Sequence, residues 1–106
     1  MYIVLVKNKV NQSKKTEYMR DSQLFAEEMK EVAGCKDTYV LTSADYEDVI
    51  VNVEVWESKY VYEQYDGHVF LKYKEKLKSN FISNTIETYN TLTKKICLAY
   101  LFIQDK

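Results

Sequence analysis

The sequence contains no proline, only two glycines and a single histidine among its 106 residues. With so little proline and glycine, its turns must use Asn, Asp and Ser side chains, which hydrogen-bond to the nearby backbone. One histidine cannot build a metal site by itself, and no carboxylate lies at helical spacing from His68 to complete a ligand pair. We therefore expect no metal site.

Cysteine and long apolar runs are also scarce. Cys35 and Cys97 are too few for a disulfide framework, and no signal peptide precedes them. The apolar run at residues 96–103 is much shorter than the roughly 18–20 residues that cross a bilayer. These absences predict a cytoplasmic protein with reduced thiols and no membrane partner.

Basic charge is not in excess, since the formal net charge is −1. Domains that bind nucleic acid normally carry a basic patch and a high pI. The sequence does contain a lysine cluster at Lys72, Lys74, Lys76 and Lys78. On a helix the first and third of these point about 160° away from the second and fourth. We interpret the cluster as a solvated helix surface and expect no nucleic-acid partner.

The hydrophobic pattern predicts a strand, a helix, two strands, a helical region and a last strand. Strands are expected over residues 2–10, 36–43 and 49–56, and helices over residues 13–33, 58–65 and 69–78. The last strand falls on residues 85–92 or on residues 96–103, because both windows are rich in strand-forming residues. The length predicts one domain over residues 1–106, in which residues 93–106 form a C-terminal strand or an arm exchanged between protomers.

This order predicts an α+β, ferredoxin-like βαββαβ sheet with helices on one face. The alternate residues from 49 to 55 are all valine, so one face of that strand needs a dry partner, whereas Asn52, Glu54 and Trp56 make the other face mixed. A sheet with one bare apolar face would expose a large patch in a monomer. We therefore predict a homodimer that stacks the two sheets into a dimeric α/β barrel.

A local sequence pattern adds a family resemblance. Gly34-Cys35 ends the predicted first helix, residues 54–58 read Glu-Val-Trp-Glu-Ser at the end of a strand, and the only histidine, His68, follows. From about residue 1 to residue 92 this order resembles the antibiotic biosynthesis monooxygenase domain family. The resemblance implies the same dimeric barrel. It also implies a cofactor-independent monooxygenase that oxidises a small aromatic or quinol substrate with O₂.

Such a reaction needs a dry pocket, a base and a hydrogen-bond donor to the resulting anion. We assign the role of base to His68 and the role of donor to Asn8 or a tyrosine. In the competing interpretation, His68 is a structural residue that links two helices. Asn8 interrupts an apolar strand face, so its amide must be hydrogen-bonded if it is buried. The expected substrate-binding residues are Phe25, Met29, Trp56, Tyr65 and Tyr73.

Two other functions remain open. One branch of the family that this sequence resembles degrades haem, and Asn8 matches the Asn that this branch uses. The catalytic Trp of the branch falls on Tyr65 here, and its haem-ligating His falls near Lys74 or Tyr73. Haem binding would therefore require His68 or Tyr73 as the axial ligand. The other function is a non-enzymatic, dimeric ligand-binding or stress-related module, because one fold serves many functions.

Overall fold

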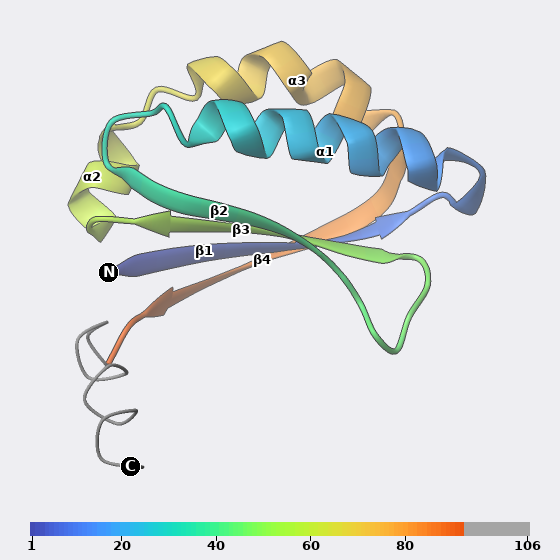
Figure 1. Ribbon diagram of the computed structural model, residues 1–106, viewed down its shortest axis with the longest axis horizontal. Coiled ribbons are helices and arrows are strands. Elements are labelled where there is room, and N and C mark those ends of the chain that lie inside the picture. Colours follow the sequence, from blue (N-terminus) through green and yellow to red (C-terminus); the bar gives the residue numbers. More distant parts are fainter. Residues whose placement is uncertain (93–106) are drawn as a thin grey trace, which may run out of the picture.

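The computed structural model describes residues 1–92, and in these residues four strands form one antiparallel sheet with the order β2-β3-β1-β4 (Figure 1). The elements in chain order are β1 (Tyr2–Val10), the 3₁₀ turn η1 (Gln12–Lys14), α1 (Lys15–Met29), β2 (Cys35–Thr42), β3 (Val49–Trp56), α2 (Lys59–Gln64), α3 (His68–Lys78) and β4 (Phe81–Asn90). Helices α1 and α3 lie over one face of the sheet, with α2 at one end (Figure 1). The predicted ferredoxin-like α+β fold is confirmed.

The predicted boundaries hold for β1 and β3 and shift elsewhere. Helix α1 ends at Met29 instead of residue 33, and the chain turns before Gly34, whose φ is +87°. A Cβ on Gly34 would lie 2.0 Å from the Cγ1 atom of Val61, so glycine allows this turn to pack against α2. The last strand overlaps the first of the two predicted windows. The second window, and the proposed C-terminal arm over residues 93–106, lie outside the described residues.

Side-chain hydrogen bonds begin the 3₁₀ turn η1 and helix α2. Asn11 caps η1, because its Oδ1 accepts from the Ser13 backbone N–H at 3.1 Å. Ser58 caps α2, since its Oγ accepts from the Val61 backbone N–H at 3.1 Å. Such caps satisfy N–H groups that have no partner inside the helix. In this proline-free chain, polar side chains thus mark where helices start.

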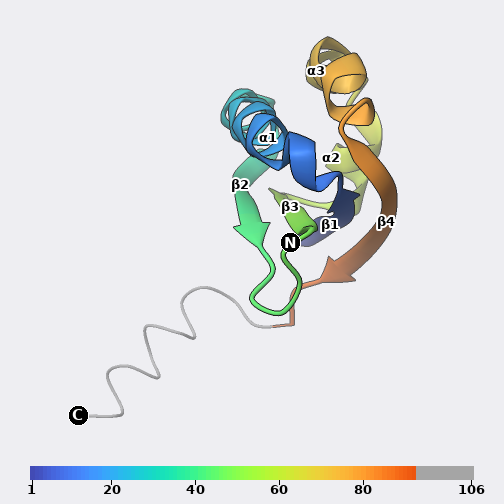
Figure 2. The same cartoon turned by 90° about the vertical axis from the view of Figure 1, so that its right-hand side faces the viewer.

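The hydrophobic core lies between the sheet and the helices. Ile50 and Trp56 of β3 are fully buried there, together with Val4 of β1 and Tyr18 and Met29 of α1. These strand residues occupy the face that the helices cover, which we call the covered face (Figure 2). Trp56 packs against two tyrosines, and its ring centroid lies 5.4 Å from that of Tyr62 and 5.5 Å from that of Tyr65. The mixed face of β3 is therefore the inner one.

The opposite side of the sheet, which we call the open face, is apolar at its centre. Val53 pairs with Leu5 on one side and Tyr39 on the other, so the three side chains form a row across β1, β3 and β2. Tyr39 and Leu41 remain 48% and 47% exposed. No helix or strand of residues 1–92 covers this face. In the part of the chain described, no helix is long and apolar enough to cross a membrane.

Candidate functional site

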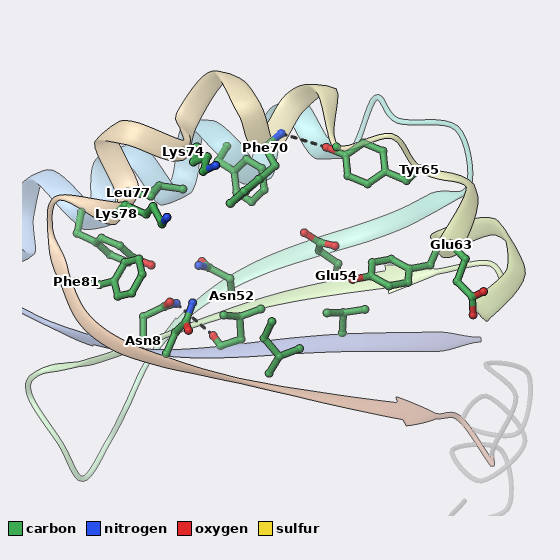
Figure 3. A pocket seen from close by; sticks show the side chains of 18 residues that line it. Asn8, Asn52, Glu54, Glu63, Tyr65, Phe70, Lys74, Leu77, Lys78 and Phe81 are labelled. Atoms are coloured by element: carbon green, nitrogen blue, oxygen red, sulfur yellow. Dashed lines mark hydrogen bonds between the residues drawn. The ribbon is translucent and has the colours of Figure 1, made fainter.

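A cavity of about 510 Å³ lies between the covered face and the helices (Figure 3). This volume is within the range of pockets that hold small organic ligands. The polar residues of its floor come from three strands: Asn8, Asn52, Glu54 and Asn84. Its roof comes from α1, α3 and the segment between α2 and α3, and includes Tyr18, Phe25, Tyr65, Phe70, Lys74 and Lys78.

The strand register explains why three amides gather on the floor. Asn8 of β1 lies directly opposite Asn84 of β4, and Asn52 of β3 lies opposite Val6. Asn52 is therefore diagonal to Asn8, at a distance that long side chains span across neighbouring strands. Because side chains alternate along a strand, all three amides and Glu54 share the covered face.

Glu54 is a half-buried carboxylic acid on the floor of the cavity. Burial raises its pKa, since water no longer solvates the charged form, and the Trp56 indole opposes this by donating a hydrogen bond to Oε1 at 2.9 Å. The carboxyl group therefore holds its proton to a higher pH than an exposed glutamate. A carboxyl group with this property, placed in a cavity, is suited to proton transfer.

Asn8 is 2% exposed, and its amide group has a defined orientation. Its Nδ2 donates to the backbone carbonyls of Val6 and Ile50, each at 3.3 Å (Figure 3). Both donors of the amide are thereby occupied, and only the oxygen remains free to face a ligand. The predicted role of Asn8 as donor to an oxyanion does not fit this geometry. An acceptor role does.

Tyr65 links the cavity to the start of α3. Its hydroxyl oxygen accepts from the backbone N–H group of Phe70 at 3.1 Å (Figure 3). It also accepts from the backbone N–H group of Val69 at 3.1 Å and donates to Met29 Sδ at 3.3 Å. Burial raises the Tyr65 pKa, and these two N–H donors oppose that shift. The residue therefore serves as a cap of α3 and also lines the cavity, as predicted.

His68 lies outside the cavity. Its side chain is 60% exposed, and its Nδ1 lies 2.5 Å from Asp66 Oδ1, which also accepts from the His68 backbone N–H. The hydrogen bond from His68 is the main cause of the lowered pKa of Asp66. The ring borders a separate hollow next to α2. A catalytic role for His68 stays a prediction, while the helix-junction interpretation describes its contacts.

The remaining predicted residues divide between the cavity and its surroundings. Phe25 lines the cavity. Met29 and Trp56 are fully buried in the core and do not line it. Tyr73 is also outside the lining, and its hydroxyl donates to Glu28 Oε1 at 2.6 Å. Asn8, Phe25 and Tyr65 are thus the predicted site residues that the structure brings together.

The family model of antibiotic biosynthesis monooxygenases matches residues 1–69, which is more than half of the chain. The chain belongs to this family. No curated protein matches its sequence.

Solved structures at low sequence identity share the fold. A conserved protein of Methanosarcina mazei is 22% identical, with a TM-score of 0.74 over 85% of this chain and 91% of the other. SnoaB of Streptomyces nogalater, described as a cofactor-independent oxygenase, is 13% identical, with a TM-score of 0.73 over 89% of this chain and 95% of its own. A protein of Nitrosomonas europaea, provisionally named as an antibiotic biosynthesis monooxygenase, is 17% identical, with a TM-score of 0.79 over 88% and 100% of the chains.

The haem branch of the family requires an axial ligand inside the cavity. His68 and Tyr73, the two ligands that the sequence offers, both lie outside the cavity lining, and Lys74 occupies the lining near the expected position. Haem iron is normally held by His, Cys, Met or Tyr. The two ligands that the sequence predicted are therefore not placed to hold a haem iron in this cavity, whereas Tyr18, Tyr62 and Tyr65 do line it. Within residues 1–92, no three His, Cys, Asp or Glu side chains are grouped to hold a metal ion.

Sequence reasoning missed Asn52 and Glu54 as site residues, although it separated the mixed face of β3 from the valine face. An amide and a carboxylate alternating with valines are the signal that could have identified them. It also placed the whole lysine cluster on a solvated surface, whereas Lys74 is half-buried in the cavity lining; Lys78 borders the cavity but is exposed, as predicted. The predicted split of that cluster into two directions is correct.

Proposed function

We propose that this protein oxidises a small aromatic hydroxyl compound with O₂, using the side chains of its cavity and no bound cofactor. The observation that carries the proposal is the half-buried Glu54 carboxyl group, which lies in a cavity with apolar walls and has its pKa raised by desolvation. Membership of the monooxygenase family and the likeness in fold to a cofactor-independent oxygenase support the same conclusion.

The proposed reaction converts a phenol and one O₂ into a quinone and one water. A base removes the phenolic proton, and the electron-rich ring then passes one electron to O₂. The ring radical and superoxide combine to form a C–O bond, and loss of water breaks the O–O bond and leaves the second carbonyl. The ring loses four electrons and O₂ gains four, so no further reductant is needed.

In this scheme Glu54 accepts the phenolic proton. Phe25 and Phe70 of the roof provide aromatic walls for the ring, and their own rings are 6.2 Å apart in an edge-to-face arrangement. Lys74 brings positive charge to the same cavity and so favours the ionised form of the phenol.

We further propose that the chain is one domain that works in the cytoplasm as a two-fold homodimer joined through the open face. The exposed apolar row formed by Leu5, Tyr39 and Val53 supports this assembly. A patch of this kind is costly on a soluble monomer. Stacking two such faces back to back leaves the cavity on the outer side of each sheet.

The test of the oxidation is oxygen uptake with a panel of naphthols and hydroquinones, followed together with quinone absorbance. We expect turnover by the wild type and a loss of about 10²–10⁴-fold in kcat for Glu54→Gln, the usual contribution of a general base. Glu57→Gln, which removes an exposed carboxylate of the same strand end, is the matched control. No uptake with any member of the panel would leave a ligand-binding module instead.

His68→Ala separates the two candidate bases. Since His68 lies outside the cavity, we expect this variant to keep the wild-type turnover. Loss of turnover in His68→Ala with activity kept in Glu54→Gln would return the role of base to His68.

A haemin titration tests the second branch of the family. We expect no saturable shift of the Soret band, because neither predicted axial ligand lines the cavity. A stoichiometric shift that decays after addition of ascorbate in air would contradict the proposed function and support haem degradation.

A further inference from the structure

Two lysines at one end of the cavity have no carboxylate partner. Within residues 1–92, no carboxylate lies within 4.0 Å of the Lys74 or Lys78 ammonium group. By contrast, Lys72 on the outer side of the same helix is 3.0 Å from Glu28 Oε2. Lys74 and Lys78 therefore bring two unpaired positive charges to the cavity lining, whereas Lys76, which also has no carboxylate within 4.0 Å in residues 1–92, lies outside it.

The amides on the floor present acceptors rather than donors. Asn8 uses its Nδ2 for two backbone carbonyls, which leaves its oxygen free. The Oδ1 of Asn52 is buried and accepts no hydrogen bond from any residue in the described part of the chain. A buried acceptor without a donor costs about 1–3 kcal/mol in a folded protein. A ligand hydroxyl in the cavity would remove that cost.

The lysines and the amides belong to the same end of the cavity. Helix α3 ends at Lys78 and leads directly into β4 at Phe81, which pairs with Val10 at the end of β1. Asn8 lies two residues before Val10, so the amide cluster is at this end. Glu54 lies toward the other end, where β3 finishes at Trp56 opposite Tyr2 (Figure 3).

We propose that this end of the cavity, formed by Lys74, Lys78, Asn8 and Asn52, is a subsite for an ionised oxygen with a neighbouring hydroxyl. The ligand class is then an aromatic hydroxy acid or a polyhydroxylated aromatic anion, with the acidic group at the lysines and the hydroxyl donating to the amide oxygens. The claim that this ligand is the substrate rests on the proposed oxidation. The claim that it binds here is independent of that oxidation.

The test is equilibrium binding to the full chain by calorimetry in the absence of oxygen, with three naphthalene probes. They are 4-hydroxy-2-naphthoate, which carries both groups, 2-naphthoate, which lacks the hydroxyl, and 1-naphthol, which lacks the carboxylate. We expect 4-hydroxy-2-naphthoate to bind about tenfold more tightly than 1-naphthol, the effect of a little over 1 kcal/mol of charge pairing. Raising the salt concentration should shrink that ratio.

The lysine subsite is tested by the double variant Lys74→Gln/Lys78→Gln, which should bring the two Kd values within about threefold of each other. Lys72→Gln/Lys76→Gln is the matched control, because it removes the same two charges from the same helix at positions outside the cavity lining. We expect this control to keep the wild-type ratio. Equal effects of the control and of the cavity variants would overturn the proposal, since they would indicate a general charge effect.

The amide subsite is tested by Asn52→Leu. This variant should lose the preference for 4-hydroxy-2-naphthoate over 2-naphthoate. It should also lose some stability, because the Asn52 side chain hydrogen-bonds to Tyr18. A preserved hydroxyl preference would overturn the acceptor role. Thermal unfolding of every variant confirms that each comparison is made on folded protein.

Turnover assays separate this inference from the proposed oxidation. Tight, lysine-dependent binding without oxygen uptake would defeat the oxidation and leave the subsite intact. Turnover of neutral naphthols with no preference for the charged probes would defeat the subsite and leave the oxidation intact.

Discussion

The two faces of the sheet carry opposite residue patterns although they belong to the same four strands of residues 1–92. Beside its apolar core residues, the covered face holds Asn8, Asn52 and Glu54 around a cavity, whereas the open face carries the half-buried Leu5 and Val53. A simple globular domain would place these residues the other way round. This placement supports our proposals of a polar aromatic ligand inside the cavity and a second apolar sheet against the open face.

The strongest way to break this comparison is to place a charge on the open face. In Val53→Asp each protomer would bury an unpaired carboxylate at the proposed interface, at about 3–5 kcal/mol per charge. Two-fold symmetry applies that cost twice. In light scattering we expect the wild type to be a dimer and Val53→Asp to be a monomer. Val53→Thr, whose side chain has a similar shape, is the control and should stay a dimer. A monomeric wild type would rule out the barrel.

The core of the covered face should be the most sensitive to truncation. Trp56 is fully buried and packs against two tyrosine rings, so Trp56→Ala should lower the free energy of unfolding by about 3–5 kcal/mol. Tyr46, which is 66% exposed, provides the control variant Tyr46→Ala. Urea unfolding measures both. Similar losses in the two variants would mean that the covered face is not the main core.

A smaller effect tests the burial of Glu54. Its pKa is raised above 4.5 by desolvation, so the folded state holds the proton more tightly than the unfolded state. Stability due to this group is therefore greatest below pH 4.5 and falls as the pH rises through the folded pKa. We expect the thermal midpoint of Glu54→Gln to rise relative to that of the wild type as the pH increases. A difference in thermal midpoint that is independent of pH would mean that the Glu54 carboxyl group is solvated by water in the folded protein.

The mildest test concerns the thiol next to this carboxyl group. Burial and, to a smaller extent, the charge of the nearby Glu54 raise the pKa of Cys35 to about 11. Only the thiolate reacts, so iodoacetamide at pH 8 should alkylate Cys35 about a hundredfold more slowly than an exposed cysteine. Peptide mapping distinguishes this site from Cys97. Urea should restore the ordinary rate, and fast labelling of the folded protein would show that the thiol is accessible.

Local patterns predicted most of the fold. The alternation of β1 and β3 was specific enough to define both strands with their observed bounds. The end of α1 was predicted too late, because the residues after Met29 are compatible with a helix and the close packing of Gly34 on Val61 is a long-range contact. Propensity cannot detect a contact of this kind.

The candidate site was predicted less well than the fold. His68 was an obvious choice by residue type, but a side chain at a helix start can turn either way, and here it turns to Asp66 on the surface. Lys74 was dismissed as solvated because helical spacing gives only the angle between lysines. Which of the two directions meets the cavity depends on how α3 sits against the sheet.

The sequence by itself determined the order of the elements, the alternation of side chains along each strand and hence the groups of residues that share a face. It set Asn52 and Glu54 apart from the valines of β3, since a strand has a fixed period of two. Only the tertiary structure decided which face the helices cover. That choice depends on the summed packing of α1 and α3 against all the strands, and it turned an unusual polar pattern into the floor of a cavity.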